Sequence, residues 1–476
     1  MSNAASLWTA PIWNDARTSS VPPDPPDPLI SLTPLLRQWL PRQRWFAGKG
    51  RPVEDFTLVS ATGLLPPGGS AGLLHLLIRT PEPGADCYQL LIGLRAALPP
   101  HLASALIGHV TEGPLTGLTA YDALLDPRLA GLLLERLRTP GTLGALRFDR
   151  DPDAALPAPG LTPRPLGAEQ SNSSLVYGNA YILKLFRRVH VGVNPDLELP
   201  RALARAGCAR VPAPIAWFEG VLDGERATLG VLQPFLRGSD DGWQLALHAL
   251  ADGRDFRTEA YELGRATAEI HTALADALPT QTLRKQQTDN LASDMIRRLE
   301  ETARAVPALA PYAPGLRTAF DAVTALGQSG HTWPVQRIHG DLHLGQALRA
   351  RDGGEWSLID FEGEPARPLP ERTRPQPVTR DIAGMLRSFD YAARSHRPWD
   401  PGWAAGCRDA YCEGYAALAG SDPRAEPELL RAYETDKAVY EVLYEARHRP
   451  DWLPVPMAAI QRLAAPAAPL PRRPTP

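Results

Sequence analysis

The feature that most restricts the possible folds is a pair of short polar segments in the second half of the chain. The first segment is Ile338-His339-Gly340-Asp341-Leu342-His343-Leu344-Gly345-Gln346, and the second is Asp360-Phe361-Glu362. The catalytic loop of protein kinases places a metal-binding Asn five residues after its catalytic Asp, and an Asp-Phe-Gly segment follows. Here Gln346 follows Asp341 by five residues, and its amide oxygen is also a hard ligand for Mg²⁺.

This spacing predicts a magnesium-dependent phosphoryl-transfer centre. Asp341 would orient or deprotonate the attacking hydroxyl, while Gln346 and Asp360 would hold Mg²⁺ on the phosphates of ATP. The apolar runs that contain the two ligands are separated by a short turn, so we expect both side chains to converge on one ion. The alternative is a turn capped by His339 with two aspartates on the surface; the ordered set of residues argues against it.

Lysine is scarce in this chain, which makes each lysine informative. Of 50 basic residues, only four are lysine: Lys49, Lys184, Lys285 and Lys437. The guanidinium of Arg is planar and has several donors, whereas the ammonium of Lys is a compact point charge, so the two are not interchangeable in a tight phosphate site. Lys184 lies in the middle of the strand-like run Tyr181–Phe186, the position of the kinase lysine that holds the α- and β-phosphates. We therefore expect Lys184 to bind ATP.

The kinase lysine pairs with a Glu on the next helix, and Glu198 is the candidate here. Pro195 suits the first position of a helix capped by Asn194. Pro200 is unfavourable in a helix interior, so we expect the helix to start later, with Pro200 in its first turn.

No Gly-x-Gly-x-x-Gly loop occurs to cover the phosphates. Ser171, Asn172 and Ser173 lie between the first two expected strands instead, and their backbone N–H groups and side chains can donate to phosphate oxygens. Gln233 precedes the Pro-containing segment that leads out of the small lobe, and we include it among the ATP-binding residues. The alternative for the Ser/Asn segment is an ordinary polar turn.

The distribution of Pro, Gly and apolar runs predicts five regions. We expect a flexible Pro-rich arm at 1–28, an N-terminal cap subdomain at 29–125, a nucleotide-binding small lobe at 126–236, a helical C-lobe at 237–465 and a flexible tail at 466–476. Short apolar runs separated by polar turns indicate antiparallel strands in the small lobe, and residues 346–361 indicate one hairpin in the helical lobe. The expected class is α+β: a bilobal protein-kinase-like fold with an extra cap.

Composition excludes several other classes of protein. The net charge of −3 shows no excess of positive charge of the kind that binds nucleic acid. The N-terminus lacks the pattern of a signal peptide, and no apolar run is long enough to span a bilayer. Four cysteines are too few for a disulfide framework in this length, so we expect a cytoplasmic protein with reduced thiols.

Two helical segments of the second half carry further candidate residues. Asp381 begins an amphipathic segment and is expected to support the catalytic loop rather than to catalyse. Asp436, Tyr440 and Tyr444 recur every four residues, on one helical face. From their spacing alone, the side chains of Tyr440 and Tyr444 fit either a position in the core or a platform for a sugar, and both interpretations stay open.

With these residues in view, the chain from about 30 to 465 resembles the bacterial maltokinases, of the aminoglycoside-phosphotransferase-like branch of kinase folds. The resemblance is carried by Gln170–Ser174, Ile338–Gln346, Leu358–Pro365, Arg380–Tyr391, the cap segment Arg44–Arg51 and the C-terminal segment Asp436–Trp452. It implies that ATP and maltose give maltose 1-phosphate and ADP with Mg²⁺, between trehalose isomerisation and the synthesis of α-glucan (glycogen).

The resemblance also implies residue roles. Asp341 would be the base, Gln346 and Asp360 the metal ligands and Lys184 the phosphate holder. We expect His343, Glu362, Asp436, Tyr440 and Tyr444 to be candidate sugar contacts. Some relatives are fused to a trehalose synthase, so such an enzyme is a possible separate partner.

Three alternatives remain at this stage. A kinase for glucosamine or glucose would have the same catalytic residues and a different acceptor pocket. An aminoglycoside-type phosphotransferase would need an acidic groove for its polycationic substrate. A catalytically dead scaffold would be expected to lack Lys184, Asp341 or Asp360, and all three are present.

Overall fold

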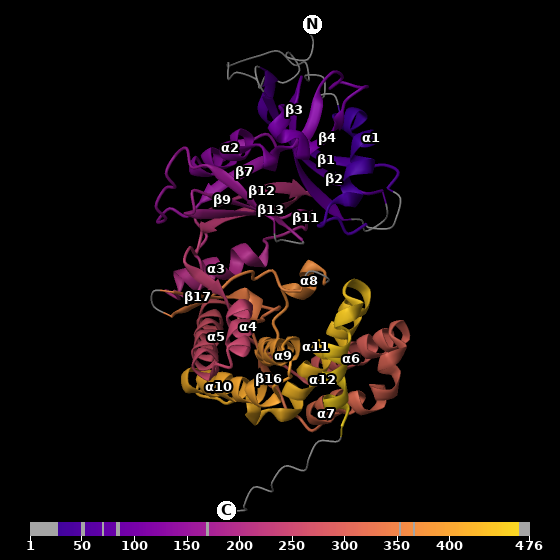
Figure 1. The fold of residues 1–476 in the computed structure, drawn as a ribbon, viewed down its shortest axis with the longest axis vertical. Coiled ribbons are helices and arrows are strands. Elements are labelled where there is room, and N and C mark those ends of the chain that lie inside the picture. The colour runs from indigo at the N-terminus through magenta and orange to yellow at the C-terminus, as the bar shows by residue number, and fades with distance from the viewer. Residues whose placement is uncertain are drawn as a thin grey trace, which may run out of the picture. The chain divides into compact units, whose positions relative to one another are not determined.

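The computed structural model describes residues 27–48, 53–68, 71–81, 86–167, 171–351, 354–364 and 367–465. Lys49, Gln170, the turn at 352–353, the tail and all but the last two residues of the arm lie outside these ranges. The chain divides into two compact units (Figure 1): Met1–Glu198 with Ala213–Arg237, and Leu199–Pro212 with Gly238–Pro476. The mixed helix and sheet content confirms the expected α+β class.

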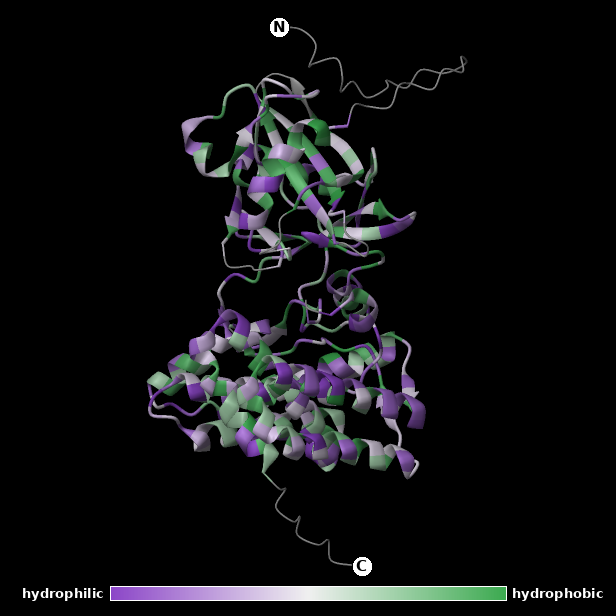
Figure 2. Ribbon diagram, turned by 90° about the vertical axis from the view of Figure 1, so that its right-hand side faces the viewer, coloured by the Kyte–Doolittle hydropathy of each residue, from purple (hydrophilic) through white to green (hydrophobic). Residues whose placement is uncertain are grey.

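The N-terminal unit begins with a sheet that one helix covers. Its elements are α1 (Leu29–Trp39), β1 (Thr57–Gly68), β2 (Ala71–Arg79), β3 (Cys87–Arg95), β4 (Leu106–His109) and β5 (Thr119–Asp122), with strand order β1-β2-β3-β5-β4. All but the last residue of β2 and of β3 are buried, in agreement with the hydrophobic strands visible in Figure 2. Leu32 and Leu36 of α1, one turn apart, pack on these strands.

A second sheet in the same unit carries Lys184. It consists of β6 (Gly141–Leu143), β7 (Leu146–Arg150), β8 (Pro163–Leu166), β9 (Ser173–Tyr177), β10 (Tyr181–Leu185), β12 (Ala216–Leu222) and β13 (Glu225–Pro234). The order β6-β7-β12-β13-β10-β9-β8 contains the expected meander β8-β9-β10, and its pairs are antiparallel. Helix α2 (Pro127–Arg138) also belongs to this unit, and the Asp126 side chain caps it.

One buried amide joins the two sheets. Gln89 of β3 donates from Nε2 to the carbonyl oxygens of Phe186 (3.0 Å) and Leu229 (2.9 Å), and β11 (Arg188–Val189) pairs with β3. Phe186 lies two residues after Lys184. The cap sheet therefore braces the strand that presents this lysine.

Helix α3 (Pro195–Arg205) corrects one expectation. The helix starts at Pro195 behind Asn194, whose Oδ1 accepts from the Asp196 N–H at 2.9 Å, and it continues through Pro200. We expected the helix to begin later because an interior proline removes one backbone hydrogen bond. Leu197, Leu199 and Leu203 are almost completely buried, and this burial offsets the lost bond.

The C-terminal unit is mainly helical. Its helices are α4 (Gly242–Ala251), α5 (Arg257–Ala277), α6 (Lys285–Ala305), α7 (Ala313–Gln328), α8 (Leu369–Arg372), α9 (Thr379–Ser395), α10 (Pro401–Ala419), α11 (Pro427–His448) and α12 (Pro454–Ala464). One core cluster contains Leu263 of α5, Phe389 of α9, Tyr411 of α10 and Val442 of α11. No helix within the described ranges is long and apolar enough to cross a membrane.

Short strands interrupt these helices. The expected hairpin is present as β17 (Ala347–Ala350) and β18 (Trp356–Leu358), and β14 (Ser239–Asp241) pairs with its outer edge. A further pair, β15 (Gln281–Leu283) with β16 (Trp333–Val335), was not expected. These strands are only three or four residues long, too short to give a clear alternating pattern.

Candidate active site

The β17–β18 hairpin brings Gln346 and Asp360 together. Gln346 is the last residue of a 3₁₀ turn, η6 (Leu344–Gln346), and its carbonyl accepts from the Ile359 N–H at 3.0 Å. Gln346 Nε2 lies 3.0 Å from Asp360 Oδ2. A carboxylate oxygen and an amide oxygen are the hard donors that Mg²⁺ prefers, and a carboxamide presents its oxygen after a simple flip. The donor set therefore fits the ion that the sequence predicted.

Gly340 and Asp360 both have left-handed backbone conformations. Gly340 has φ of 85°, and Asp360 has φ of 66°. Glycine adopts such angles without a steric penalty, and Asp and Asn do so more readily than other residues. The loop conformation thus explains why Gly340 precedes Asp341.

Asp381 fixes the catalytic loop from the start of α9. Its two carboxylate oxygens accept from the backbone N–H groups of His339 and Gly340, each at 2.8 Å, and His271 Nε2 lies 3.2 Å from Oδ2. Burial would raise the pKa of Asp381, but the contacts with His271 and Gly340 hold this pKa below its ordinary value. These bonds confirm the expected supporting role.

Helix α9 also packs very closely on the loop. A Cβ placed at Gly384 would lie 2.6 Å from the carbonyl oxygen of Leu342. Only glycine permits this approach without displacing the backbone that carries Asp341.

The two histidines of the loop make internal contacts. His339 Nε2 lies 2.9 Å from the Ile359 carbonyl oxygen, and its ring packs on Phe361 at 4.6 Å between centroids. His343 accepts from the Gly345 N–H through Nδ1 at 3.1 Å, and burial lowers the pKa of His343. His343 thus acts in the structure as the cap of η6, and its proposed contact with sugar stays a prediction.

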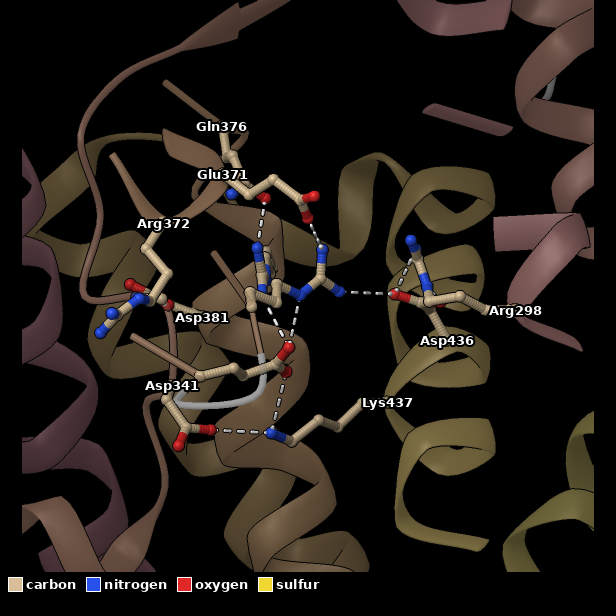
Figure 3. Close-up of polar contacts among 12 residues, drawn as sticks. Arg298, Asp341, Glu371, Arg372, Gln376, Asp381, Asp436 and Lys437 are labelled. Atoms are coloured by element: carbon tan, nitrogen blue, oxygen red, sulfur yellow. Dashed lines mark hydrogen bonds and ion pairs between the residues drawn. The ribbon is translucent and has the colours of Figure 1, made fainter. Parts of the chain in front are cut away.

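Lys437 of α11 contacts Asp341 directly, which no sequence motif indicated. Its Nζ lies 2.8 Å from Asp341 Oδ1 and 3.3 Å from Glu364 Oε1, and Figure 3 shows the contact with Asp341. Burial would lower the pKa of Lys437, but Asp341 and Glu364 raise it well above its usual value. Lys437 is therefore a cation at any pH at which the protein would work.

The carboxylates around this lysine are neutralised by arginines. Glu364 contacts Arg367 at 2.6 Å and Arg380 at 3.1 Å. Burial would raise the pKa of Glu364, but Arg380, Lys437 and Arg367 together hold it far below its usual range. Asp436 is bound by both Nε and Nη2 of Arg298 at 2.9 Å, so this candidate sugar contact is already engaged (Figure 3).

The remaining candidate acceptor residues lie near these groups. Lys437 Nζ lies over the ring of Tyr440 at 4.9 Å, and the Tyr440 and Tyr444 rings stack at 6.2 Å. Glu362 lies 3.7 Å from Arg372. A cavity of about 20 Å³, enough for one water molecule, is lined by Asp341, Lys437 and their neighbours. Substrate contacts at Tyr440, Tyr444, Glu362 and Asp436 stay predictions.

The N-terminal unit holds the candidate ATP-binding residues. Lys184 forms an ion pair with Asp196 at 2.9 Å, two residues before the Glu198 that the sequence favoured. Both side chains are largely buried, so the ammonium is held firmly. The Ser173 hydroxyl accepts from Arg187 Nε at 2.8 Å.

The other candidate ATP-binding residues lie on or beside the same strands. Asn172 is buried, Ser171 is exposed, and Gln233 is paired with Ile182 across β10 and β13. Phosphate binding by these residues stays a prediction.

Comparison with known proteins shows which family the chain resembles. Residues 39–126 match the model of the maltokinase N-terminal cap domain, and residues 160–421, more than half of the chain, match that of the phosphotransferase enzyme family. The chain is 28% identical over 332 residues to a glucosamine kinase of Streptacidiphilus jiangxiensis, covering 63% of this chain and 73% of that protein. It is 29% identical over 326 residues to a glucosamine kinase of Mycolicibacterium smegmatis, covering 63% and 79%.

The fold is also similar to a solved structure. A glucosamine kinase in complex with glucosamine, ADP and inorganic phosphate superposes with a TM-score of 0.64 at 23% identity, covering 86% of this chain and 94% of that one. At this identity the match supports the kinase-like fold with its cap, as the sequence predicted.

Proposed function

Because this chain belongs to the phosphotransferase enzyme family and carries a maltokinase-type cap domain, we propose that it phosphorylates maltose with ATP. The anomeric hydroxyl of maltose would attack the γ-phosphorus of ATP. The new bond joins the sugar oxygen to phosphorus, the bond from the γ-phosphorus to the β,γ-bridging oxygen breaks, and the products are maltose 1-phosphate and ADP.

Asp341 is the proposed proton acceptor. Lys437 contacts Asp341 Oδ1, so the second oxygen, Oδ2, would accept the proton of the acceptor hydroxyl. The bonds from Asp381 fix the backbone before Asp341, so the carboxylate is held in place before the substrate arrives. Proton removal by a positioned carboxylate is standard general-base chemistry.

Gln346 and Asp360 would hold magnesium in this site, and Lys184 would bind the α- and β-phosphates. The metal, when bound, neutralises charge on the phosphates as the leaving ADP forms. Lys184 is a compact ammonium kept in place by Asp196, which suits contact with phosphate oxygens.

The observation that carries the choice of a neutral acceptor is the charge state around Asp341. An amino sugar such as glucosamine brings an ammonium group, and it needs a carboxylate that is available to pair with it. Lys437 already lies against Asp341, Glu364 is bonded to two arginines and Asp436 to Arg298. A second ammonium beside Lys437 would meet repulsion, so these groups favour a neutral sugar.

Glucosamine remains the second candidate, because the two relatives at 28% and 29% identity are glucosamine kinases. Glucose is a further neutral acceptor with the same catalytic requirements. A cytoplasmic location and a trehalose-converting partner stay predictions from the sequence.

A product analysis tests the proposal. The purified full chain is incubated with Mg-ATP and maltose, ADP release is followed, and the product is examined by ³¹P NMR. We expect a phosphate coupled to the anomeric proton and a sugar without a reducing end, with no product from Asp341→Asn. ADP release without a sugar phosphate, or phosphate on another hydroxyl, would contradict the assignment.

A further inference from the structure

A second cavity lies in the C-terminal unit, at the opposite end of α9 from the catalytic loop. It has a volume of about 620 Å³ and is lined by residues from the end of α4, the segment before α5, the loop after α9 and the start of α10. Ligand pockets in proteins usually measure about 300–1,000 Å³. Helix α9 has 17 residues, so its two ends are separated by about 25 Å. The cavity is therefore separate from the site around Asp341.

Two indole rings line this cavity. Trp399 keeps 47% of its surface exposed, although Trp is usually covered in a folded protein. The guanidinium of Arg394 lies 3.5 Å from the centroid of the Trp399 ring and holds it in place. Trp403 is stacked on Phe256 with centroids 5.8 Å apart. Each ring thus packs against a neighbouring side chain.

The charged side chains that line the cavity balance one another. Arg254 and Arg257 equal Asp255 and Asp400 in number, and the ion-pair partner of Arg254 is Asp252, which does not line the cavity. Arg257 pairs with Asp255 at 2.7 Å, and Asp400 accepts from the Trp403 N–H at 2.9 Å. A balanced set gives little net attraction for an anion or a cation. It supplies guanidinium donors and carboxylate acceptors close together, which suits a ligand with many hydroxyl groups.

From the indole rings, the balanced polar rim and the volume, we infer that this cavity binds a short neutral oligosaccharide. Neutral sugars bind through their apolar faces on aromatic rings and through hydroxyl groups on paired donors and acceptors. The inference does not depend on which sugar is phosphorylated, because binding here requires no turnover.

The test is a titration of the full chain with maltotriose by isothermal titration calorimetry. Trp399→Ala is compared with Trp399→Phe and with Leu418→Ala, an exposed apolar residue of α10 (37% exposed) that does not line the cavity. We expect Trp399→Ala to weaken maltotriose binding at this site by about tenfold or more, and Trp399→Phe to retain most of it. Leu418→Ala should bind as the wild type does, and kcat for phosphoryl transfer should be the same in all four proteins.

Two results would overturn the inference. One is a wild-type chain that binds no maltotriose, or binds it with the same affinity and stoichiometry after Trp399→Ala. The other is binding of inorganic phosphate that Arg257→Gln abolishes, which would make the cavity an anion site. Since Trp399 and Arg257 are both exposed, neither substitution should unfold the protein, and thermal unfolding checks this.

Discussion

Replacing Lys437 with Met should lower kcat strongly while leaving the affinity for ATP nearly unchanged. Met keeps a flexible apolar side chain of similar length and removes only the ammonium. The Nζ group donates to Asp341 at 2.8 Å, and the side chains of Lys437 and Asp341 are only 18% and 20% exposed. Hydrogen bonds to charged groups contribute about 1.5–3 kcal/mol.

If that stabilisation serves the transition state, kcat falls by about 10- to 150-fold. Stability should fall less than for a fully orphaned buried carboxylate, because Glu364 keeps Arg367 and Arg380. We expect a loss of about 1–3 kcal/mol in the free energy of unfolding.

The assay is steady-state ADP release with maltose and ATP varied separately, together with urea unfolding. Lys285→Met is the matched control, since Lys285 is exposed at the first position of α6 and the substitution removes the same charge. A Lys437→Met enzyme with kcat within twofold of the wild type would refute the role given to this lysine. A rise in the KM for ATP at constant kcat would refute it as well.

Two further predictions follow from other groups. Asp360→Asn should reduce phosphoryl transfer by about a thousandfold or more, because Asn supplies no negative charge to the metal. The fold should stay intact, because Asn tolerates the φ of 66°. Near wild-type activity with an unchanged circular dichroism spectrum would show that magnesium is held elsewhere. His75 tests the cap, because burial lowers its pKa from 6.5 to about 4 although Gln89 opposes the shift. As pH falls, the imidazole of His75 is protonated in the unfolded chain before it is protonated in the folded one. The contribution of neutral His75 to the free energy of unfolding is therefore full above pH 6.5 and is lost toward pH 4, with about 2 kcal/mol of the loss between pH 7 and pH 5. His75→Gln should remove that part of the pH dependence in urea unfolding, and an equal slope in both proteins would contradict the assignment.

Local sequence patterns predicted the β17–β18 hairpin and the approach of Gln346 to Asp360. Asp341, Gln346 and Asp360 lie close together in the sequence, so local backbone geometry brings the two proposed metal ligands together. The start of α9 at the loop was predictable for the same reason, from Asp381 and the amphipathic segment behind it.

Contacts between distant segments were harder to predict. Lys437 contacts Asp341 and Glu364 across 96 and 73 residues of sequence, and no local motif encodes such a contact. The scarcity of lysine in the chain is the one sequence signal that points to Lys437. Lys184 forms an ion pair with Asp196, which the sequence did not suggest. Asp196 and Glu198 both lie in the first turn of α3, and pairing of Lys184 with Glu198 stays a prediction.

Local sequence patterns also could not predict the short strands or the surroundings of the proposed acceptor site. Strand β6 has three residues, so no alternation could mark it. The proposed preference for a neutral acceptor depends on which arginines neutralise Glu364 and Asp436, and those pairs form only in the folded chain.

The specificity ratio between maltose and glucosamine tests the central claim most directly. Both sugars are assayed with the same enzyme preparation, saturating Mg-ATP and varied acceptor, and kcat/KM is compared. We expect maltose to exceed glucosamine by at least about tenfold, because the ammonium of glucosamine would be placed beside Lys437. A ratio that favours glucosamine would contradict the neutral-acceptor assignment and would place this chain with the glucosamine kinases it matches.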